Sequence, residues 1–289
     1  MSSLLAIIGY PIGHSISPAI YNATLPAMGI DARYEAWSTP PDEVAAAIEK
    51  LRLPRLLGMN VTVPHKSAVI PFLDAVNPMA ARIGAVNCIV KEDGRLVGHN
   101  TDRYGFLRSL REAGCEPAGL DVLLLGNGGA ARAVAYGLLE AGIPSLTVAG
   151  RSPERVGAFV ASIRDAGDGV ALASTGWTEE ELGPSARRAG LIVNSTSVGM
   201  RHSETEGSSP LPAALIPAGA WCYDLVYTPA ETRFLSDARD AGAWPIGGLE
   251  MLVYQAAESV RLWTGREPPI DIMRKAAQTA LGQATGDGH

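Results

Sequence analysis

The chain has 289 residues, of which 47% are hydrophobic and 19% charged, and its net charge is −6. This length suggests two domains or one large one, and the composition is that of an ordinary globular protein. No basic run exceeds two residues, which argues against a nucleic-acid partner. No apolar run approaches membrane-spanning length, and residues 4–9 read as a strand rather than a signal peptide, so no membrane partner is expected.

The cysteines and histidines narrow the expected chemistry further. Cys88, Cys115 and Cys222 are odd in number and widely spaced, which favours reduced, mostly buried thiols in the cytoplasm. The five histidines show no metal-ligand spacing, so no metal site is expected.

Strand and helix patterns alternate along the first hundred residues. Strands are predicted at residues 4–9, 34–38 and 57–63, and helices at 18–28 and 42–51. Residues 85–91 and 95–98, joined by Glu92-Asp93-Gly94, are typical of a hairpin, and a helix is expected at 102–113. A hairpin within this alternation predicts a mixed α/β sheet rather than a purely parallel one.

A second α/β unit is predicted to start near residue 120. Its strands are expected at 122–125, 146–149, 170–173, 191–194, 221–225 and 244–246, with helices between them, which is typical of a doubly wound sheet. A long amphipathic helix at 249–264 is expected to return to the first domain and make it discontinuous. The predicted domains are therefore 1–101 plus 248–289, and 102–247.

The most informative stretch is the glycine-rich turn after the strand at 122–125. Residues 126–131, Gly-Asn-Gly-Gly-Ala-Ala, follow four apolar residues and lead into an alanine-rich helix. They fit the pattern G-x-G-x-x-A, in which Gly126 makes the tight turn and Gly128 lets a pyrophosphate approach the positive end of the helix. Such turns occur in many folds, but the strand that follows a helix of suitable length favours a dinucleotide site.

Two serines after the first strand have two interpretations. In His14-Ser15-Ile16-Ser17-Pro18, Ser17 is typical of a helix cap. The two hydroxyls also form a hydrogen-bonding shelf for a carboxylate or a hydroxyl group. On this pattern alone, helix capping is favoured over ligand binding.

Further polar residues lie at predicted strand ends. If Val61 and Val63 are core, alternation places Asn60 and Thr62 together on the other face, at the strand end where ligands bind. Lys66 alone reads as a solvated lysine, Asp102 as a helix N-cap, and Asn87 is unusual inside a predicted strand. Taken together, lysine, aspartate and amides at strand ends fit an anionic, polyhydroxylated small molecule better than a core.

These motifs resemble the shikimate dehydrogenase family. The resemblance rests on Gly13-His14-Ser15-x-Ser17-Pro18, Asn60-Val-Thr-Val-Pro-His-Lys66, Asn100-Thr-Asp102, the glycine-rich turn, and Gly248-Leu-Glu-Met-Leu252 with Gln255-Ala256. The motifs occur in the family's order, from residue 9 to about 265. Two departures are Tyr21, where many members have histidine, and Glu250, where glycine is common.

The resemblance implies a fold, α/β with two domains. One is a discontinuous mixed-sheet α/β substrate domain, the other a Rossmann doubly wound dinucleotide-binding domain, and the active site lies in the cleft between them. Lys66 and Asp102 would form the catalytic pair, because reducing a ketone needs a proton donor that an ammonium beside a carboxylate can supply. Further implied substrate contacts are Ser15 and Ser17 to the carboxylate, Thr62, Asn87 and Gln255 to ring hydroxyls, and Tyr227 at the cleft.

The implied cofactor is NADP. Arg151 and Arg155 stand at the end of the second Rossmann strand, where an NAD enzyme would place an acid for the ribose 2′-hydroxyl. The other implied cofactor contacts are Gly126, Asn127, Gly128, Gly129, Ala130, Ser152, Asn194, Ser195, Thr196, Val226, Gly248 and Met251.

The resemblance therefore implies an NADP-dependent shikimate dehydrogenase that reversibly reduces 3-dehydroshikimate in chorismate and aromatic amino-acid biosynthesis. A small-molecule substrate, a cytoplasmic location and a monomer or homodimer are expected with it. A quinate or aminoshikimate dehydrogenase on the same scaffold is an alternative, because such enzymes can differ by one or two side chains. A non-catalytic metabolite sensor is a second alternative, and the presence of both Lys66 and Asp102 counts against it.

Overall fold

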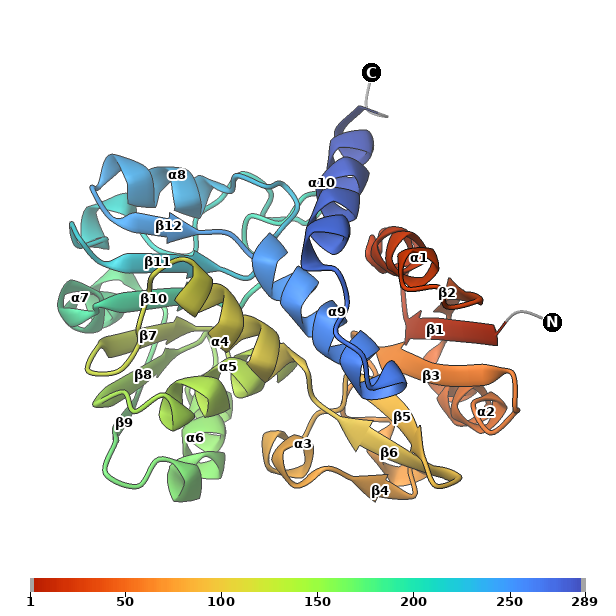
Figure 1. Ribbon diagram of the computed structural model, residues 1–289. Helices are drawn as coiled ribbons and strands as arrows, with labels where there is room; N and C mark the ends of the chain where they lie inside the picture. The colour runs from red at the N-terminus through yellow and green to blue at the C-terminus, as the bar shows by residue number, and fades with distance from the viewer. Residues whose placement is uncertain (1–2, 287–289) are drawn as a thin grey trace. The chain divides into compact units, whose positions relative to one another are not determined.

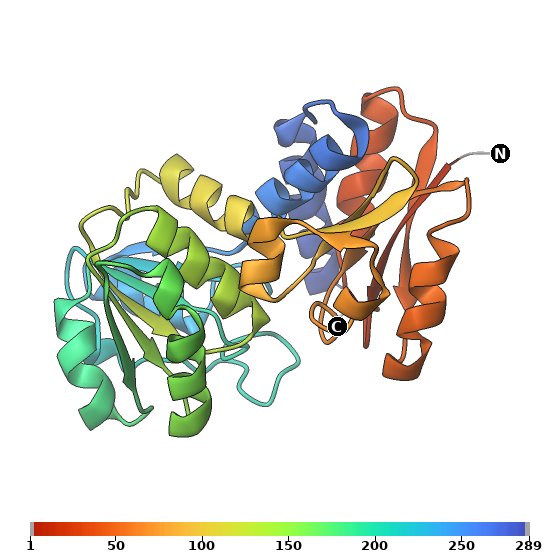
Figure 2. The same ribbon diagram turned by 90° about the horizontal axis from the view of Figure 1, so that it is seen from below.

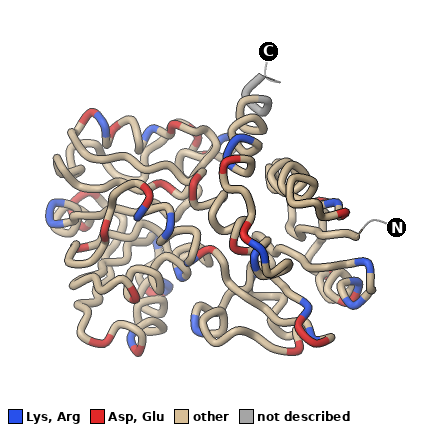
Figure 3. Tube along the Cα trace, viewed as in Figure 1, with Lys and Arg blue, Asp and Glu red and all other residues tan. Residues whose placement is uncertain are grey.

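The computed structural model of the chain describes residues 3–286, with side chains as far as residue 282. The chain divides into two compact units, Met1–Gly105 with Leu252–His289 and Phe106–Met251. The predicted domain boundaries, after residues 101 and 247, each lie four residues before the boundaries in the structure, which come after Gly105 and Met251. The predicted end of the first domain at residue 289 lies outside the described residues. Within residues 3–286, no helix is long and apolar enough to cross a membrane. Basic and acidic residues are interspersed along the trace (Figure 3).

The first unit is built on a six-stranded sheet in the order β2-β1-β3-β5-β6-β4 (Figure 1). Its strands are β1 (Ser3–Gly9), β2 (Ala32–Ser38), β3 (Leu56–Val61), β4 (Ala75–Val76), β5 (Cys88–Glu92) and β6 (Arg95–His99). β1 pairs in parallel with β2 and β3, whereas β5 pairs antiparallel with β3 and β6. The predicted hairpin is therefore present, and it makes the sheet mixed.

The helices of this unit come from both ends of the chain. They are α1 (Ser17–Ala27), η1 (Pro41–Glu43), α2 (Val44–Lys50), η2 (Ile70–Phe72), α3 (Pro78–Ile83) and α10 (Ile270–Gly286), with the start of α4 (Asp102–Glu112) and most of α9 (Leu249–Thr264). α10 lies beside α1 (Figures 1 and 2). β4, α3 and α10 were not predicted; β4 and α3 have only two and six residues, too few to show a clear period.

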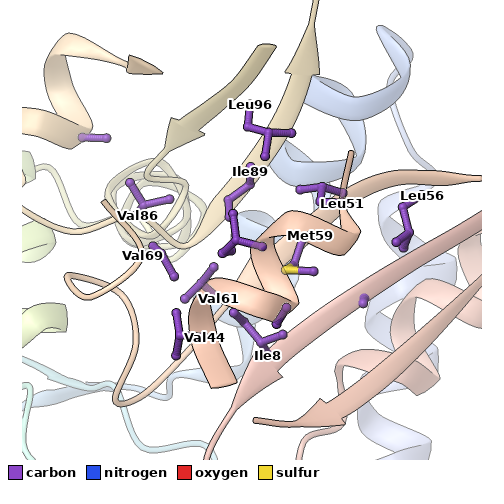
Figure 4. Packing of buried hydrophobic residues seen from close by; sticks show 14 residues of the cluster. Ile8, Val44, Leu51, Leu56, Met59, Val61, Val69, Val86, Ile89 and Leu96 are labelled. Carbon is purple, nitrogen blue, oxygen red and sulfur yellow. The ribbon is translucent and has the colours of Figure 1, made fainter. Parts of the chain in front are cut away.

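Alternation along β3 separates a hydrophobic core from a polar face. Met59 and Val61 pack with residues of α2 and of neighbouring strands in one buried cluster (Figure 4). Asn60 points to the opposite face, where its side chain bonds Ser259 of α9. The predicted strand to residue 63 ends earlier, at Val61, and the condition that Val63 is core is not met, because Val63 is 69% exposed.

The second unit contains a six-stranded parallel sheet in the order β12-β11-β10-β7-β8-β9. Its strands are β7 (Asp121–Leu125), β8 (Ser145–Ala149), β9 (Ala171–Thr175), β10 (Leu191–Asn194), β11 (Trp221–Asp224) and β12 (Trp244–Ile246). Its helices, besides the rest of α4 and the start of α9, are α5 (Gly129–Glu140), α6 (Pro153–Ser162), η3 (Arg164–Ala166), α7 (Glu179–Arg188), η4 (Ala213–Leu215) and α8 (Arg233–Asp240). This is the strand order of a doubly wound Rossmann sheet, the fold that was predicted. The order in which the chain adds strands reverses between β7 and β10, and such sheets bind ligands at that point.

Helices cover both faces of this parallel sheet. Leu123 and Leu125 of β7 pack in a buried cluster with side chains of α7 and α8. On the other face, Tyr223 of β11 stacks edge-on against Phe106 of α4, and its hydroxyl lies 2.6 Å from the Ser109 hydroxyl. Because both faces are covered at the centre of the sheet, β7 and β10 read as continuous apolar runs, and this made them predictable.

Candidate active site

Strand direction brings the polar residues of the first unit to one edge of its sheet. β1, β3 and β6 run the same way, so the loops that carry residues 15–17, 62–66 and 100–102 begin at the same edge. β5 runs in the opposite direction, so Asn87, just before its first residue, reaches that edge from the other end. Asn87 was predicted inside a strand. It lies instead at the strand's start, where its backbone C=O accepts the Val61 N–H at 2.9 Å.

Lys66 and Asp102 form an ion pair at this edge. The Lys66 Nζ donates to the Asp102 Oδ2 at 2.6 Å, and the two side chains are 17% and 8% exposed. The Lys66 loop is held from both sides, because the Val86 N–H donates to the Lys66 C=O at 2.7 Å and the buried His65 ring bonds the Thr39 C=O at 2.7 Å. The lysine is therefore not a solvated surface residue.

The Asp102 side chain does not cap a helix. It is the first residue of α4, and its carboxylate bonds Lys66 and Asn87, while the Asn100 Oδ1 accepts the Arg103 N–H at 3.4 Å. The N-cap interpretation of Asp102 is therefore wrong, because long-range partners hold the carboxylate.

The Asn87 amide has one fixed orientation. Its Oδ1 accepts the Thr101 backbone N–H at 2.7 Å, so its Nδ2 must face Asp102, and it donates to Oδ1 of that carboxylate at 2.8 Å. Each carboxylate oxygen of Asp102 thus receives an N–H. Gln255 of α9 joins the cluster, with its Oε1 3.4 Å from both the Asn87 Nδ2 and the Thr101 Oγ1.

The two serines lie at the start of α1. The N-cap residue is Ile16 and has no side-chain cap, so the preferred capping interpretation of Ser17 is wrong. Instead, the Ser15 Oγ accepts the Ser17 N–H at 3.3 Å, and the Ser17 side chain is buried. Thr62 lies against Gly9 at the neighbouring strand end. Within the described residues, no hydrogen bond joins Ser15, Ser17 or Thr62 to the Lys66–Asp102 cluster.

In the second unit, the glycine-rich turn has the geometry of an anion cradle. Gly126 has φ +108°, and a Cβ there would lie 2.7 Å from the Ser195 Oγ, so the turn requires glycine. A Cβ at Gly128 or Gly129 would meet no atom within 4 Å. α5 begins at Gly129 without a side-chain cap or an acid in its first turn, so its first N–H groups suit a pyrophosphate.

Arg151 and Arg155 lie exposed between β8 and the first turn of α6. Ser152 is the N-cap of α6, and its Oγ accepts the Arg155 N–H at 3.4 Å. Neither arginine forms an ion pair with an acid in the part of the chain that the structure describes. Positive charge near a helix N-terminus is unfavourable unless an anion compensates it, so this pair suits a phosphate group.

The predicted cofactor residues at the end of β10 and just after it form hydrogen bonds with other groups of the protein. Asn194 is fully buried, and its Oδ1 accepts the backbone N–H and the hydroxyl of Thr196 at 3.0 and 2.7 Å. The Ser195 Oγ donates to the Leu125 C=O at 2.7 Å. These side chains shape the loop beside the glycine-rich turn.

Sequence reasoning missed Asp224, which organises the loops after β10 and β11. Its Oδ1 accepts from the Asn194 Nδ2 at 2.9 Å and from the Val226 N–H at 3.0 Å, and its Oδ2 accepts from the Thr232 Oγ1 at 2.6 Å. Burial raises the pKa of this carboxyl to about 6, although the three hydrogen bonds oppose the rise. The sequence signal that could have identified Asp224 is a single acidic residue at the end of a mostly apolar strand.

Comparison with known proteins places this geometry in a family. Residues 7–89 match the model of the shikimate dehydrogenase substrate binding domain, and residues 248–278 match that of the shikimate 5′-dehydrogenase C-terminal domain. The shikimate dehydrogenase (NADP(+)) of Moorella thermoacetica is 47% identical to this chain, and the match covers 99% of the chain and 96% of that relative. The chain belongs to the shikimate dehydrogenase family.

Solved structures of similar proteins share the whole fold. The shikimate 5-dehydrogenase of Thermus thermophilus, crystallised with NADP(H) and shikimate, has a TM-score of 0.86 and 40% identity, covering 96% of this chain and all of that one. The quinate dehydrogenase of Corynebacterium glutamicum, in complex with NAD, has a TM-score of 0.88 and 32% identity, covering 96% of this chain and 99% of that one. The same scaffold therefore carries enzymes named for different substrates.

The remaining predicted site residues belong to the second unit of this family member. Val226 and Met251 are buried, and Tyr227 is half-buried, which raises the pKa of its phenol. Gly248 lies directly against the Leu225 carbonyl, where any side chain would overlap the backbone. These positions are therefore closely packed.

Proposed function

We propose that this member of the shikimate dehydrogenase family catalyses the reversible, NADP-dependent reduction of 3-dehydroshikimate to shikimate. The observation that carries the proposal is the Lys66–Asp102 pair, 2.6 Å apart and joined by Asn87 at one sheet edge. The near-complete coverage of a relative named shikimate dehydrogenase (NADP(+)) supports the choice of substrate and cofactor.

In the proposed mechanism, the Lys66 ammonium donates a proton to the substrate's carbonyl oxygen as negative charge develops there. Asp102 holds that ammonium in place through the 2.6 Å contact, and in the reverse direction Lys66 takes the proton back. NADPH, when bound, supplies the hydride for the ring carbon. Ser15 and Ser17 would hold the carboxylate of the substrate. The ring hydroxyls would be held by Thr62, Asn87 and Gln255, with Tyr227 of the second unit as a further contact.

The residues of the second unit fit NADP. Open space at Gly128 and the uncapped start of α5 suit the pyrophosphate, and Arg151 with Arg155 suits the 2′-phosphate. The other proposed contacts are Gly126, Asn127, Gly129, Ala130, Ser152, Asn194, Ser195, Thr196, Val226, Gly248 and Met251.

Steady-state kinetics with shikimate and quinate, each against NADP and NAD, test the proposal. We expect the highest kcat/KM for shikimate with NADP. A folded protein that turns over neither substrate, or prefers quinate, would overturn the substrate assignment.

Cofactor choice is tested separately by Arg151→Ala. Because a hydrogen bond to a charged group contributes about 1.5–3 kcal/mol, the variant should bind NADP about 10- to 100-fold more weakly and leave NAD nearly unchanged. Arg164→Ala, an exposed arginine beyond the other end of α6, is the matched control and should bind both cofactors normally. Equal weakening of both cofactors by Arg151→Ala would contradict the 2′-phosphate role.

We further propose a cytoplasmic location, supported by Cys88, Cys115 and Cys222, which are all free and buried. The proposed assembly is a monomer or a homodimer. Light scattering after size-exclusion chromatography distinguishes these two from larger oligomers.

A further inference from the structure

A buried chain of hydrogen bonds extends behind the Lys66–Asp102 pair, beyond the residues proposed to touch substrate. Its members are Thr101, Ser259, Asn60 and Tyr34, whose exposed fractions are 1%, 0%, 4% and 1%. A buried polar group is costly unless it is paired, so four such groups in one row need a common reason.

Asn60 sets the direction of this chain. Its Oδ1 accepts the Tyr34 hydroxyl at 2.7 Å, so its Nδ2 must face the other way. The two Nδ2 hydrogens go to the Asn87 backbone C=O at 3.0 Å and to the Ser259 Oγ at 3.1 Å. The side-chain amide of Asn60 is therefore not free to flip.

Ser259 connects α9 to two strand ends that are far away in sequence. Its Oγ donates to the Gln255 C=O at 3.0 Å, one helical turn earlier, and accepts from Asn60. It also lies 3.3 Å from the Thr101 Oγ1. With the Ser259 proton given to Gln255, only the Thr101 hydroxyl can donate in that contact. Its other acceptors are the Asn87 Oδ1 at 3.3 Å and the Gln255 Oε1 at 3.4 Å. Its lone pairs then remain for the Asn87 Nδ2, which lies 3.0 Å away.

We propose that Ser259 is a positioning residue for the catalytic pair. It acts through Asn60, which donates to the Asn87 backbone C=O, and through Thr101, whose hydroxyl accepts from the Asn87 Nδ2. The Thr101 backbone N–H already sets which way the Asn87 amide faces. The Ser259 contacts therefore hold the amide's position and its 2.8 Å bond from Nδ2 to the Asp102 Oδ1. Without those contacts Asn87 would shift and that bond would lengthen. The carboxylate would move, and the Lys66 ammonium with it. The inference rests on the proposed function, since it assigns Ser259 a role in that reaction.

Ser259→Ala tests the proposal. It removes one hydroxyl without adding volume, and kcat for shikimate oxidation should fall about two- to tenfold, the effect of roughly one hydrogen bond. The KM for NADP, whose proposed contacts lie in the second unit, should not change. Thr24→Val is the matched control: among the described residues, this fully buried hydroxyl bonds only the Ile20 C=O of its own helix, so its loss should leave kcat at the wild-type value.

A double mutant separates positioning from general damage. If Ser259 acts through Asp102, adding Ser259→Ala to Asp102→Asn should change the residual kcat by less than about 1.5-fold, because residues that act as a unit are not additive. A full multiplicative loss in that background would overturn the proposal, as would an equal kcat loss in Thr24→Val.

Tyr34→Phe keeps the test open if Ser259→Ala does not fold. It retains the ring stacked on Tyr21 at 4.1 Å and loses only the hydroxyl that orients Asn60. A kcat decrease that vanishes in the Asp102→Asn background supports the proposal, whereas an unchanged kcat contradicts it. Wild-type protein without shikimate activity would instead refute the proposed function, so the two failures are distinguishable.

Discussion

The buried carboxyl of Asp224 should make the stability of this protein depend on pH. Burial raises its pKa from 3.8 to about 6 in the folded chain, although hydrogen bonds from Thr232, Val226 and Asn194 oppose the rise. The folded protein therefore holds this proton more tightly than the unfolded chain does. It follows that Asp224 lowers the free energy of unfolding as pH rises from about 4 to about 6, with no further loss above that.

The size of this effect follows from the two pKa values, 3.8 and about 6. A shift of one pKa unit corresponds to about 1.4 kcal/mol, so the ionised carboxylate costs about 3 kcal/mol at neutral pH relative to strongly acidic pH. Asp224→Asn removes the titration but keeps an Oδ1 that can accept from Asn194 and Val226. Relative to wild type, the variant should therefore gain about 2 kcal/mol between pH 4 and pH 7.

Urea unfolding at several pH values between 4 and 7 measures the difference, since groups common to both proteins cancel. Asp168→Asn is the control, because it removes the same charge from an exposed loop of the same unit. Its stability difference from wild type should stay nearly constant with pH. Parallel pH profiles for Asp224→Asn and wild type, or a variant that loses stability as pH rises, would refute the reasoning.

Three further substitutions test individual side chains. Lys66→Ala should lower kcat about 10²- to 10⁴-fold with far less effect on substrate affinity, and near-native turnover would mean that Lys66 donates no proton. Ser15→Ala and Ser17→Ala should both raise the KM for shikimate, but only Ser15→Ala, which loses the bond from the Ser17 N–H, should also lower stability, by about 1 kcal/mol in thermal unfolding. Tyr21→Phe should leave stability unchanged or raise it, because the buried Tyr21 hydroxyl has no hydrogen-bond partner among the described residues. A clear fall in melting temperature would contradict that.

Much of the fold was readable from local patterns. The strands at 191–194 and 244–246 and the helix at 249–264 have the predicted bounds, because apolar runs and helical periods are encoded within a few consecutive residues. The turn at Gly126 was predictable for the same reason: its positive φ and the adjoining helix start are local properties of the chain.

The sequence by itself pointed to the residues that we propose carry the chemistry, through motifs such as the one that ends at Lys66. It could not determine what each side chain bonds. Asp102 looked like a cap because its true partner, Lys66, lies 36 positions away, and Ser259 showed no signal because it meets Asn60 across 199 positions. Such contacts depend on strand order, on the direction of each strand and on where β3 ends, and these are settled only when the whole sheet and α9 pack together.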